Sequence, residues 1–412
     1  MRLFKLGMYY PVYLDRFYAE RPHLAAASYH VQHAALIADR VASSDFWTRA
    51  LQRRGYETCD TIANARPLQQ RWAQEHGVPF DDDFVTRLTI AQICAFRPDV
   101  LLVADYSTFG AAFLSEIRQR CPSILLILGW CGAPYHDASV MRSWDVALSC
   151  IPEMVEGFRA DGLDAHHVNH GFEPRILEQL QPRAHAPRAF TFLGSIVKLS
   201  RFHEERERIL QHLVTSTPLE IWSDISQPDR AGARRLRLKQ VAFSAVSLAR
   251  RGGVPNAVLR HLPVVRRAAR WETRPEDNAA VDSRIARRAK PPLFGLSMFQ
   301  QLRDSDVTLN THIDVSPRSA SNMRLFEATG TGVCLLTDWK DNLADLFEPD
   351  SEVVTYRSAA EAAEKFAHLA THPVQRAMIA AAGQRRALRD HNFDTRAERI
   401  DAIVRDSLRK RG

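Results

Sequence analysis

The sequence predicts an α/β protein built from two domains, each with a parallel β-sheet. Short apolar runs recur without polar alternation, as in parallel strands that are covered on both faces, and residues 99–104 are the clearest example. Segments with helical spacing of apolar residues separate these runs, which favours repeated strand–helix units. A stretch rich in Pro, Ala and His at 181–188 interrupts the alternation, which resumes at 190–193. We therefore expect a first domain over residues 1–182 and a second over residues 188–390.

Composition indicates an ordinary globular protein. The chain has 412 residues, of which 45% are apolar and 25% are charged. No run approaches the ~18 apolar residues of a membrane-spanning helix, and the amino terminus lacks the layout of a signal peptide. The six cysteines are scattered, without a C-x-x-C pair or zinc-type spacing with histidine. We expect reduced, buried thiols in a cytoplasmic protein, and no metal site.

Loops of the first domain are candidates for a ligand-binding edge, because the carboxyl ends of parallel strands face the ligand crevice in doubly wound domains. The first apolar strand leads into an aromatic loop, over 7–13, that contains Tyr9 and Tyr10. Asp105 and Trp130 each follow a further apolar strand. A carboxylate at such a strand end can serve as a general base. The alternatives are an aromatic cluster that packs one domain edge, for the tyrosines, and a turn or helix-capping residue, for Asp105.

The second domain opens with a strand that ends in Gly194 and Ser195, followed by a helix. A glycine turn between a strand and a helix lets the backbone approach a phosphate closely, although one glycine alone is a weak signal. The next strand ends in Trp222 and Ser223, which are candidates for contact with a nucleobase.

The stretch between residues 310 and 338 is the most informative part of the chain. It is typical of a strand end, a polar loop, a short helix closed by glycines, and a second buried strand. Ser321 and Asn322 are suitable N-cap residues, so the helix would direct free backbone N–H groups into the loop. This arrangement favours an anion such as phosphate. His312, in the loop, is either a ligand contact or a packed loop histidine.

Two charged residues follow in the first turns of this helix. Arg324 and Glu327 are three positions apart and therefore lie on one face. An arginine beside a helix N-terminus adds a charge-assisted donor for a phosphate, and a glutamate one turn deeper can accept hydrogen bonds from the two hydroxyls of a ribose. The pattern indicates a nucleoside diphosphate. The alternative is an ordinary Arg–Glu pair on a helix surface.

The same stretch resembles the donor-site signature of two-domain (GT-B) glycosyltransferases, in particular the bacterial group called family 1 or spore-maturation-like. The resemblance rests on residues 322–338 (NMRLFEATGTGVCLLTD), 346–356 and 391–396. It covers about the last 120 residues well and the rest loosely. It implies two Rossmann-like domains that face each other across a cleft, with residues 391–412 as a helix that crosses back to the first domain. It also implies that Glu327 holds the donor ribose and that the preceding loop holds the pyrophosphate.

Residues 225–291 are an insertion by comparison with that group, and they are strongly basic. Residues 230–290 contain 16 Lys/Arg and 4 Asp/Glu, a net charge of +12, whereas the whole chain carries +7. Apolar segments with flanking arginines suggest a basic amphipathic surface, suited to an anionic membrane or to a polyprenyl-phosphate-linked acceptor. The alternative is a solvated helical excursion whose charge only aids solubility. No motif of a nucleic-acid-binding module accompanies the insertion, so no nucleic acid is expected.

These inferences predict a nucleotide-sugar-dependent glycosyltransferase that acts on a glycan or polyprenyl-linked acceptor, in surface polysaccharide or glycoconjugate synthesis. Arg324 would stabilise the leaving diphosphate and Asp105 would act as the base. Tyr9, Tyr10 and Trp130 would face the acceptor. No cofactor is expected, and no metal is needed if arginines and a helix N-terminus bind the diphosphate. The location would be cytoplasmic or peripheral at the inner face of the membrane. The alternative function is a non-catalytic GT-B-like binding or scaffold protein, and a GT-B epimerase or phosphotransferase is a third.

Overall fold

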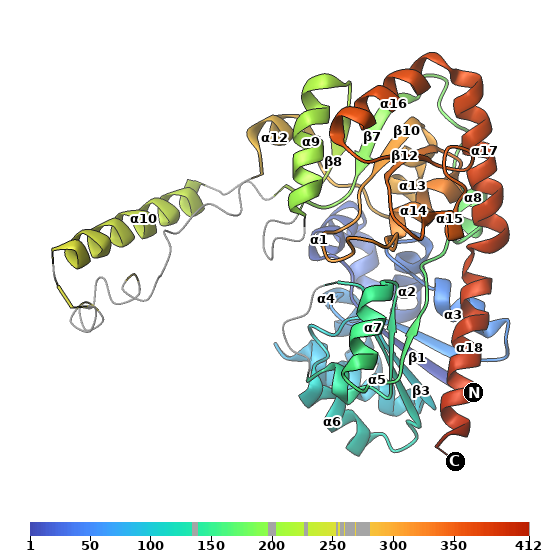
Figure 1. Ribbon diagram of the computed structural model, residues 1–412. Helices are drawn as coiled ribbons and strands as arrows, with labels where there is room; N and C mark the ends of the chain where they lie inside the picture. The colour runs from blue at the N-terminus through green and yellow to red at the C-terminus, as the bar shows by residue number, and fades with distance from the viewer. Residues whose placement is uncertain are drawn as a thin grey trace.

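The computed structural model describes residues 1–133, 139–196, 203–225, 230–252, 254–255, 259, 268 and 281–411. These residues form two six-stranded sheets, and all strands within each sheet are parallel. Figure 1 shows one sheet in each half of the molecule, with helices packed around both. The predicted α/β class with two Rossmann-like domains is therefore confirmed.

The first sheet has the order β2-β1-β3-β4-β5-β6. Its strands are β1 Arg2–Gly7, β2 Glu57–Ile62, β3 Val100–Val103, β4 Leu126–Trp130, β5 Val146–Ser149 and β6 Ala165–His167. The helices of this half are α1 Pro11–Glu20, α2 Tyr29–Ala38, α3 Phe46–Gln52, α4 Arg66–His76, α5 Phe84–Phe96, α6 Ala111–Arg120, α7 Pro152–Ala160 and α8 Arg175–Gln179, with 3-10 turns at Pro22–Ala26 and Met141–Ser143. Every residue of β3 and β5 is buried, which explains their continuous apolar sequence.

The start of α1 corrects one expectation from the sequence. Tyr9, Tyr10 and Pro11 were predicted to form an aromatic loop within the stretch 7–13, but the helix already begins at Pro11. Proline is well tolerated in the first turn of a helix, because its missing N–H would have no helical partner there. The side chains that this short helix buries are Tyr13, Leu14 and Phe17.

The second sheet has the order β12-β11-β10-β7-β8-β9. Its strands are β7 Arg188–Leu193, β8 Glu220–Trp222, β9 Ala289–Lys290, β10 Ser305–Asn310, β11 Cys334–Asp338 and β12 Val354–Tyr356. The helices of this half are α9 Glu204–Ser216, α10 Arg230–Arg251, α12 Ser283–Arg288, α13 Gly295–Arg303, α14 Met323–Thr331, α15 Leu343–Leu346, α16 Ala359–Thr371, α17 Pro373–Asp390 and α18 Phe393–Arg409.

Helix α18 crosses back onto the first sheet and its helices, as expected for residues 391–412 (Figure 1). It packs against α3, and the hydroxyl of Tyr56 donates a hydrogen bond of 2.7 Å to Asp401 Oδ1. One apolar core continues across both halves, because Phe172 at the exit of the first half packs with Phe326 of α14 and Phe393 of α18. The two halves therefore share a packed interface.

Helix α10 contains one apolar segment of the basic insertion, over 240–248, whereas most of the second, over 254–269, lies outside the described residues. In the described parts of the chain, no helix combines the length and the apolar character needed to cross a membrane. All six cysteines are free thiols; Cys59 and Cys94 are half-buried and the other four are buried.

Candidate functional site

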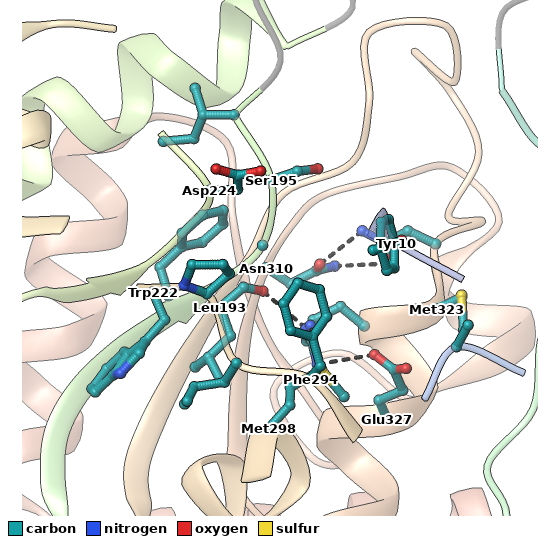
Figure 2. Close-up of a pocket in the computed structure, with 18 of the residues that line it drawn as sticks. Tyr10, Leu193, Ser195, Trp222, Asp224, Phe294, Met298, Asn310, Met323 and Glu327 are labelled. Carbon is teal, nitrogen blue, oxygen red and sulfur yellow. Dashed lines mark hydrogen bonds and ion pairs between the residues drawn. The ribbon is translucent and has the colours of Figure 1, made fainter. Parts of the chain in front are cut away.

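A large cavity lies between the two halves of the molecule, and we call it the interdomain pocket. Its volume is about 530 Å³. Figure 2 shows its wall, with side chains from the carboxyl ends of β7, β8 and β10 and from the start of α14. Its lining residues are Tyr10, Val12, Val41, Ala42, 192–196, Arg206, Trp222, Asp224, Val281, 292–295, Met298, Asn310, Thr311, 322–324 and Glu327. Seven of the predicted site residues are among them: Tyr10, Gly194, Ser195, Trp222, Asn322, Arg324 and Glu327.

The start of α14 is fixed against the end of β10. Asn322 is the N-cap, and its side chain accepts a hydrogen bond of 3.2 Å from the Leu325 backbone N–H. Its Nδ2 donates to Asn310 Oδ1 at 2.7 Å and to the Thr311 carbonyl at 3.1 Å. Because the cap satisfies one of the free N–H groups and the rest stay at the pocket wall, the positive end of the helix dipole is available to an anion.

Arg324 and Glu327 form a largely buried ion pair. The guanidinium lies 2.9 Å from Glu327 Oε2, and the two side chains are only 16% and 10% exposed. Arg324 Nε also donates a hydrogen bond of 3.1 Å to the Leu193 carbonyl, so the arginine is held toward the end of β7. Burial raises the pKa of Glu327, while the charge of Arg324 opposes this shift. The pair is therefore a part of the pocket wall, and the interpretation as an ordinary surface pair is wrong.

Arg206 of α9 is a pocket residue that sequence analysis did not identify as a site residue. The residue is 7% exposed, and its guanidinium donates to Thr311 Oγ1 at 2.8 Å, to the Thr311 carbonyl at 2.8 Å and to the Ser195 carbonyl at 2.7 Å. A fourth N–H group lies 2.9 Å from His203 Nε2. Burial lowers the pKa of Arg206 to about 10, so it stays charged at neutral pH. Burial and Arg206 lower the pKa of His203 to about 3, which keeps that imidazole neutral and able to accept.

No carboxylate among the described residues lies within ion-pair distance of Arg206. A guanidinium has five N–H donors, and four of those on Arg206 have protein acceptors. Asp338 and Asp314 favour the charged form of Arg206 from beyond ion-pair distance, but burial still lowers its pKa, so its charge is only partly compensated. The interdomain pocket thus contains a positive charge that an anionic ligand would compensate.

Part of the pocket lining is apolar. Trp222, Phe294 and Met298 contribute to it, and Lys290 lies over the Trp222 ring at 4.5 Å from its centroid. Phe294 reaches across to the first half of the molecule, where its ring lies 5.4 Å from that of Tyr10 (Figure 2). The pocket therefore offers a flat, apolar wall beside its charged wall, which suits a nucleotide with its base and its phosphates.

Three predicted residues of the second half lie outside this pocket. Ser223 is buried, and its neighbour Asp224 lines the pocket instead. The Ser321 hydroxyl donates to Ser316 Oγ at 3.1 Å and so holds the loop together. His312 lies on the other side of the loop, at a groove of about 450 Å³, with Nδ1 2.7 Å from Asp338 Oδ1. Burial would raise the pKa of Asp338, but His312 and Lys340 hold it at about 2.

Two predicted residues of the first half line a smaller cavity of about 150 Å³, which we call the first-domain cavity. Tyr9 and Asp105 lie there beside Lys5 and Asp60, which form a buried ion pair at 2.6 Å. Asp105 Oδ1 accepts hydrogen bonds of 2.8 Å from the Ser107 hydroxyl and the Thr108 backbone, as a turn residue does. Ala42 lines both cavities, so they are neighbours.

Trp130 lies apart from both cavities. Its ring packs against Trp47 at 5.6 Å and against His170 at 5.1 Å, within the core shared by the two halves. Its position at the end of β4 follows the prediction, but its side chain has a packing role. In the described part of the chain, no group of three or more His, Cys, Asp or Glu residues is arranged to hold a metal ion.

Comparison with known proteins agrees with this fold. Similar solved structures include a glycosyltransferase from Rickettsia africae ESF-5 (TM-score 0.52, 8% identity, 99% of this chain and 98% of that chain). They also include Anabaena HepE in complex with UDP-glucose (TM-score 0.54, 10% identity, 98% and 100%) and the sucrose-phosphate synthase of Thermosynechococcus elongatus (TM-score 0.52, 11% identity, 98% and 98%). No curated protein matches the chain by sequence.

The chain therefore has the two-domain fold of GT-B glycosyltransferases. Residues 245–402, which are less than half of its length, match the family model described as "Glycosyl transferase-like". This match includes Arg324, Glu327 and the closing segment 391–396. The resemblance found in the sequence is confirmed at this level, and the narrower likeness to the spore-maturation-like group stays a prediction.

Proposed function

We propose that the protein transfers a sugar from a nucleoside diphosphate to a glycan or lipid-linked acceptor. The observation that carries this proposal is the buried cation of Arg206, which has no carboxylate within ion-pair distance among the described residues and lines the interdomain pocket together with Arg324 and the start of α14. A diphosphate supplies the negative charge that this wall lacks. Glu327, one turn deeper, is placed to accept hydrogen bonds from a ribose, and the Trp222 side is suited to a base.

The proposed reaction uses these groups where charge develops. An acceptor hydroxyl oxygen attacks the anomeric carbon, the bond from that carbon to the diphosphate oxygen breaks, and the diphosphate leaves with the electron pair. Arg206, Arg324 and the helix N-terminus stabilise that leaving charge, and one such donor contributes about 2.7–4 kcal/mol in other enzymes. On this proposal the protein cations and the helix N-terminus do the work for which a metal ion would otherwise serve.

The acceptor would enter from the first half of the molecule. The first-domain cavity is next to the interdomain pocket at Ala42, and Tyr9 and Asp105 line it. We propose Asp105 as the base that takes the proton of the attacking hydroxyl, as its position after β3 suggested. Surface polysaccharide or glycoconjugate synthesis is the proposed setting, because the basic insertion suits an acceptor at an anionic surface.

A thermal-shift panel of nucleotides and nucleotide sugars tests the donor site. Uridine forms come first, because HepE was solved with UDP-glucose, and the guanosine, thymidine, cytidine and adenosine forms follow. A ligand at 100 times its dissociation constant adds about 2.7 kcal/mol of apparent stability. One nucleoside diphosphate should stabilise the wild type, and Glu327→Gln should lose most of this response.

Glu116→Gln is the matched control, because Glu116 forms an exposed i,i+4 pair with Arg120 far from the pocket. It should respond like the wild type. No response from any nucleotide, or an unchanged response in Glu327→Gln, would remove the donor-site proposal. Binding without sugar transfer or donor hydrolysis would favour the alternative of a non-catalytic binding protein.

A further inference from the structure

Helix α10 (Arg230–Arg251) lies apart from both sheets and projects away from the body of the molecule (Figure 1). Its sequence contains seven Lys/Arg residues and no Asp or Glu. It takes no part in the interdomain pocket or in the first-domain cavity. Its basic character therefore does not serve either of these two cavities.

One face of α10 is packed. Val246 is 1% exposed and contacts Leu259 and Ala268, and the small side chains of Ala242 and Ala249 pack beside it. The three α10 residues are spaced by four and three positions, so they lie on one side of the helix. This side anchors α10 to its own insertion.

A second face of α10 is apolar and exposed. Leu238 is 61% exposed, Val241 is 67% exposed and Leu248 is 72% exposed. Their spacing of three and seven positions places them in one stripe along the helix, and the exposed Ala245 lies between the last two. Three large aliphatic side chains in one exposed stripe mark an interaction surface.

Two arginines border this stripe on one side. Arg237 and Arg251 are exposed, and helical spacing places both on the same flank of the stripe; Lys239, also exposed, lies on the far flank of the packed face. A helix with an apolar stripe, a basic flank and no acidic residue has the composition of helices that lie in the interface of an anionic bilayer. A protein partner would account for the apolar stripe alone, and a nucleic acid would account for the charge alone.

We propose that α10 binds the surface of an anionic lipid bilayer, with Leu238, Val241 and Leu248 inserted among the headgroups, with Arg237 and Arg251 paired with lipid anions, and with Lys239 adding to the positive charge near the surface. This surface is independent of the donor site. If the proposed function is also correct, the helix brings the interdomain pocket to a membrane that carries lipid-linked acceptors.

Co-sedimentation with vesicles tests the proposal. The full-length protein should bind phosphatidylcholine vesicles that contain phosphatidylglycerol, bind pure phosphatidylcholine weakly, and lose binding as salt is raised. The triple substitution Leu238→Ser, Val241→Ser and Leu248→Ser should weaken binding by roughly tenfold or more for each inserted side chain. The triple substitution Arg237→Gln, Lys239→Gln and Arg251→Gln should weaken it by about a hundredfold. All six side chains are exposed, so both variants should keep the wild-type melting temperature.

The matched control is Val374→Ser with Met378→Ser, which removes two exposed apolar side chains, 74% and 67% exposed, from one face of α17. It should bind vesicles like the wild type. Glu327→Gln should also bind vesicles normally, so a failure of the donor site and a failure of the membrane surface are distinguishable.

Three results would overturn the proposal. The first is a wild-type protein that does not sediment with anionic vesicles. The second is an α10 serine variant that binds them as well as the wild type. The third is tighter binding of the wild type to single-stranded RNA than to the vesicles, which would make α10 a nucleic-acid surface.

Discussion

His391 Nδ1 accepts a hydrogen bond of 2.8 Å from the guanidinium of Arg396, five residues later in the chain. The other ring nitrogen, Nε2, donates to the Leu346 carbonyl at 2.7 Å, so the hydrogen-bonded imidazole is neutral. Arg396 also donates through Nε to the His170 carbonyl at 2.8 Å. His391 and Arg396, the two polar residues of the closing H-x-F-x-x-R segment, therefore connect the second half of the molecule to His170, near the point where the chain leaves the first half.

The backbone at this crossing is paired as well. The Phe172 N–H donates to the His391 carbonyl at 2.8 Å, and the Phe393 N–H donates to the Phe172 carbonyl at 3.2 Å. The segment around Phe172, where the chain leaves the first half, therefore lies side by side with the segment 391–393, where the chain returns to it. This arrangement gives the closing segment a structural role, distant from the chemistry of the interdomain pocket.

Burial of His391 predicts a loss of stability in mild acid. Burial and nearby Arg396 lower its pKa to about 4, from 6.5 for an exposed histidine. Between these two values the unfolded chain binds a proton that the folded chain excludes, so the free energy of unfolding falls as the pH falls from 6.5 to 4. The contribution over this window is on the order of 3 kcal/mol. Urea denaturation of wild type and His391→Gln across this range should give a smaller pH slope for the variant.

The slope should not vanish, because burial also lowers the pKa of His170 and of His203 to about 3. The control is His368→Gln, since His368 is exposed on α16. A variant slope equal to that of the wild type would show that His391 is not the titrating group.

The sequence predicted the central strands well, because strands such as β3 and β5 are buried throughout and are mostly apolar in sequence. It also predicted the Arg324–Glu327 helix, since an N-cap and a closing glycine define it locally. It did not predict β9, a two-residue strand that is only half-buried. It did not separate Arg206 from Arg208 in the charged run that opens α9. Their difference depends on Ser195 and Thr311, which contact only Arg206 in the folded chain. Phe294 was also missed, because its contact with Tyr10 forms only in the folded chain.

Substitution of Arg206 should weaken binding of the nucleoside diphosphate more than binding of the nucleoside. Arg206→Lys keeps a charge but loses the forked geometry that bonds Ser195 and Thr311 together. Hydrogen bonds to charged groups contribute about 1.5–3 kcal/mol, so binding of the nucleoside diphosphate should weaken by roughly 10- to 100-fold. Calorimetric titration with the diphosphate and with its nucleoside measures both effects.

The control is Arg208→Lys, two positions further along α9, where the arginine is 67% exposed and pairs with Glu205. It should bind both ligands like the wild type. An equal loss for the nucleoside and the diphosphate in Arg206→Lys would mean that Arg206 only shapes the pocket.

Substitution of Gly295, which contacts Asp39 of the first half, should lower both stability and nucleotide binding. Its φ is +53°, and a Cβ would lie 1.9 Å from the Asp39 carbonyl oxygen, which accepts a hydrogen bond of 2.9 Å from the Leu296 N–H. Gly295→Ala should move Phe294, lower stability by roughly 3 kcal/mol or more, and weaken nucleotide binding. Thermal melts with and without the nucleotide test both effects. Gly77→Ala is the matched control, because Gly77 has a φ of +63° with open space around it, and it should lose only about 1–2 kcal/mol.

Gly330 should be required where α14 meets the chain that leaves the first half. A Cβ at this position would lie 2.1 Å from the Phe172 ring, which is fully packed in the shared core. Gly330→Ala should therefore destabilise the protein by about 1–3 kcal/mol, although alanine favours a helix. Gly157→Ala, in α7, adds the same methyl group where no atom lies within 4 Å, and it should be neutral or stabilising by up to about 1 kcal/mol. Urea denaturation of the two variants compares them directly. Equal effects would show that the close contact between Gly330 and Phe172 does not govern the packing of the two halves.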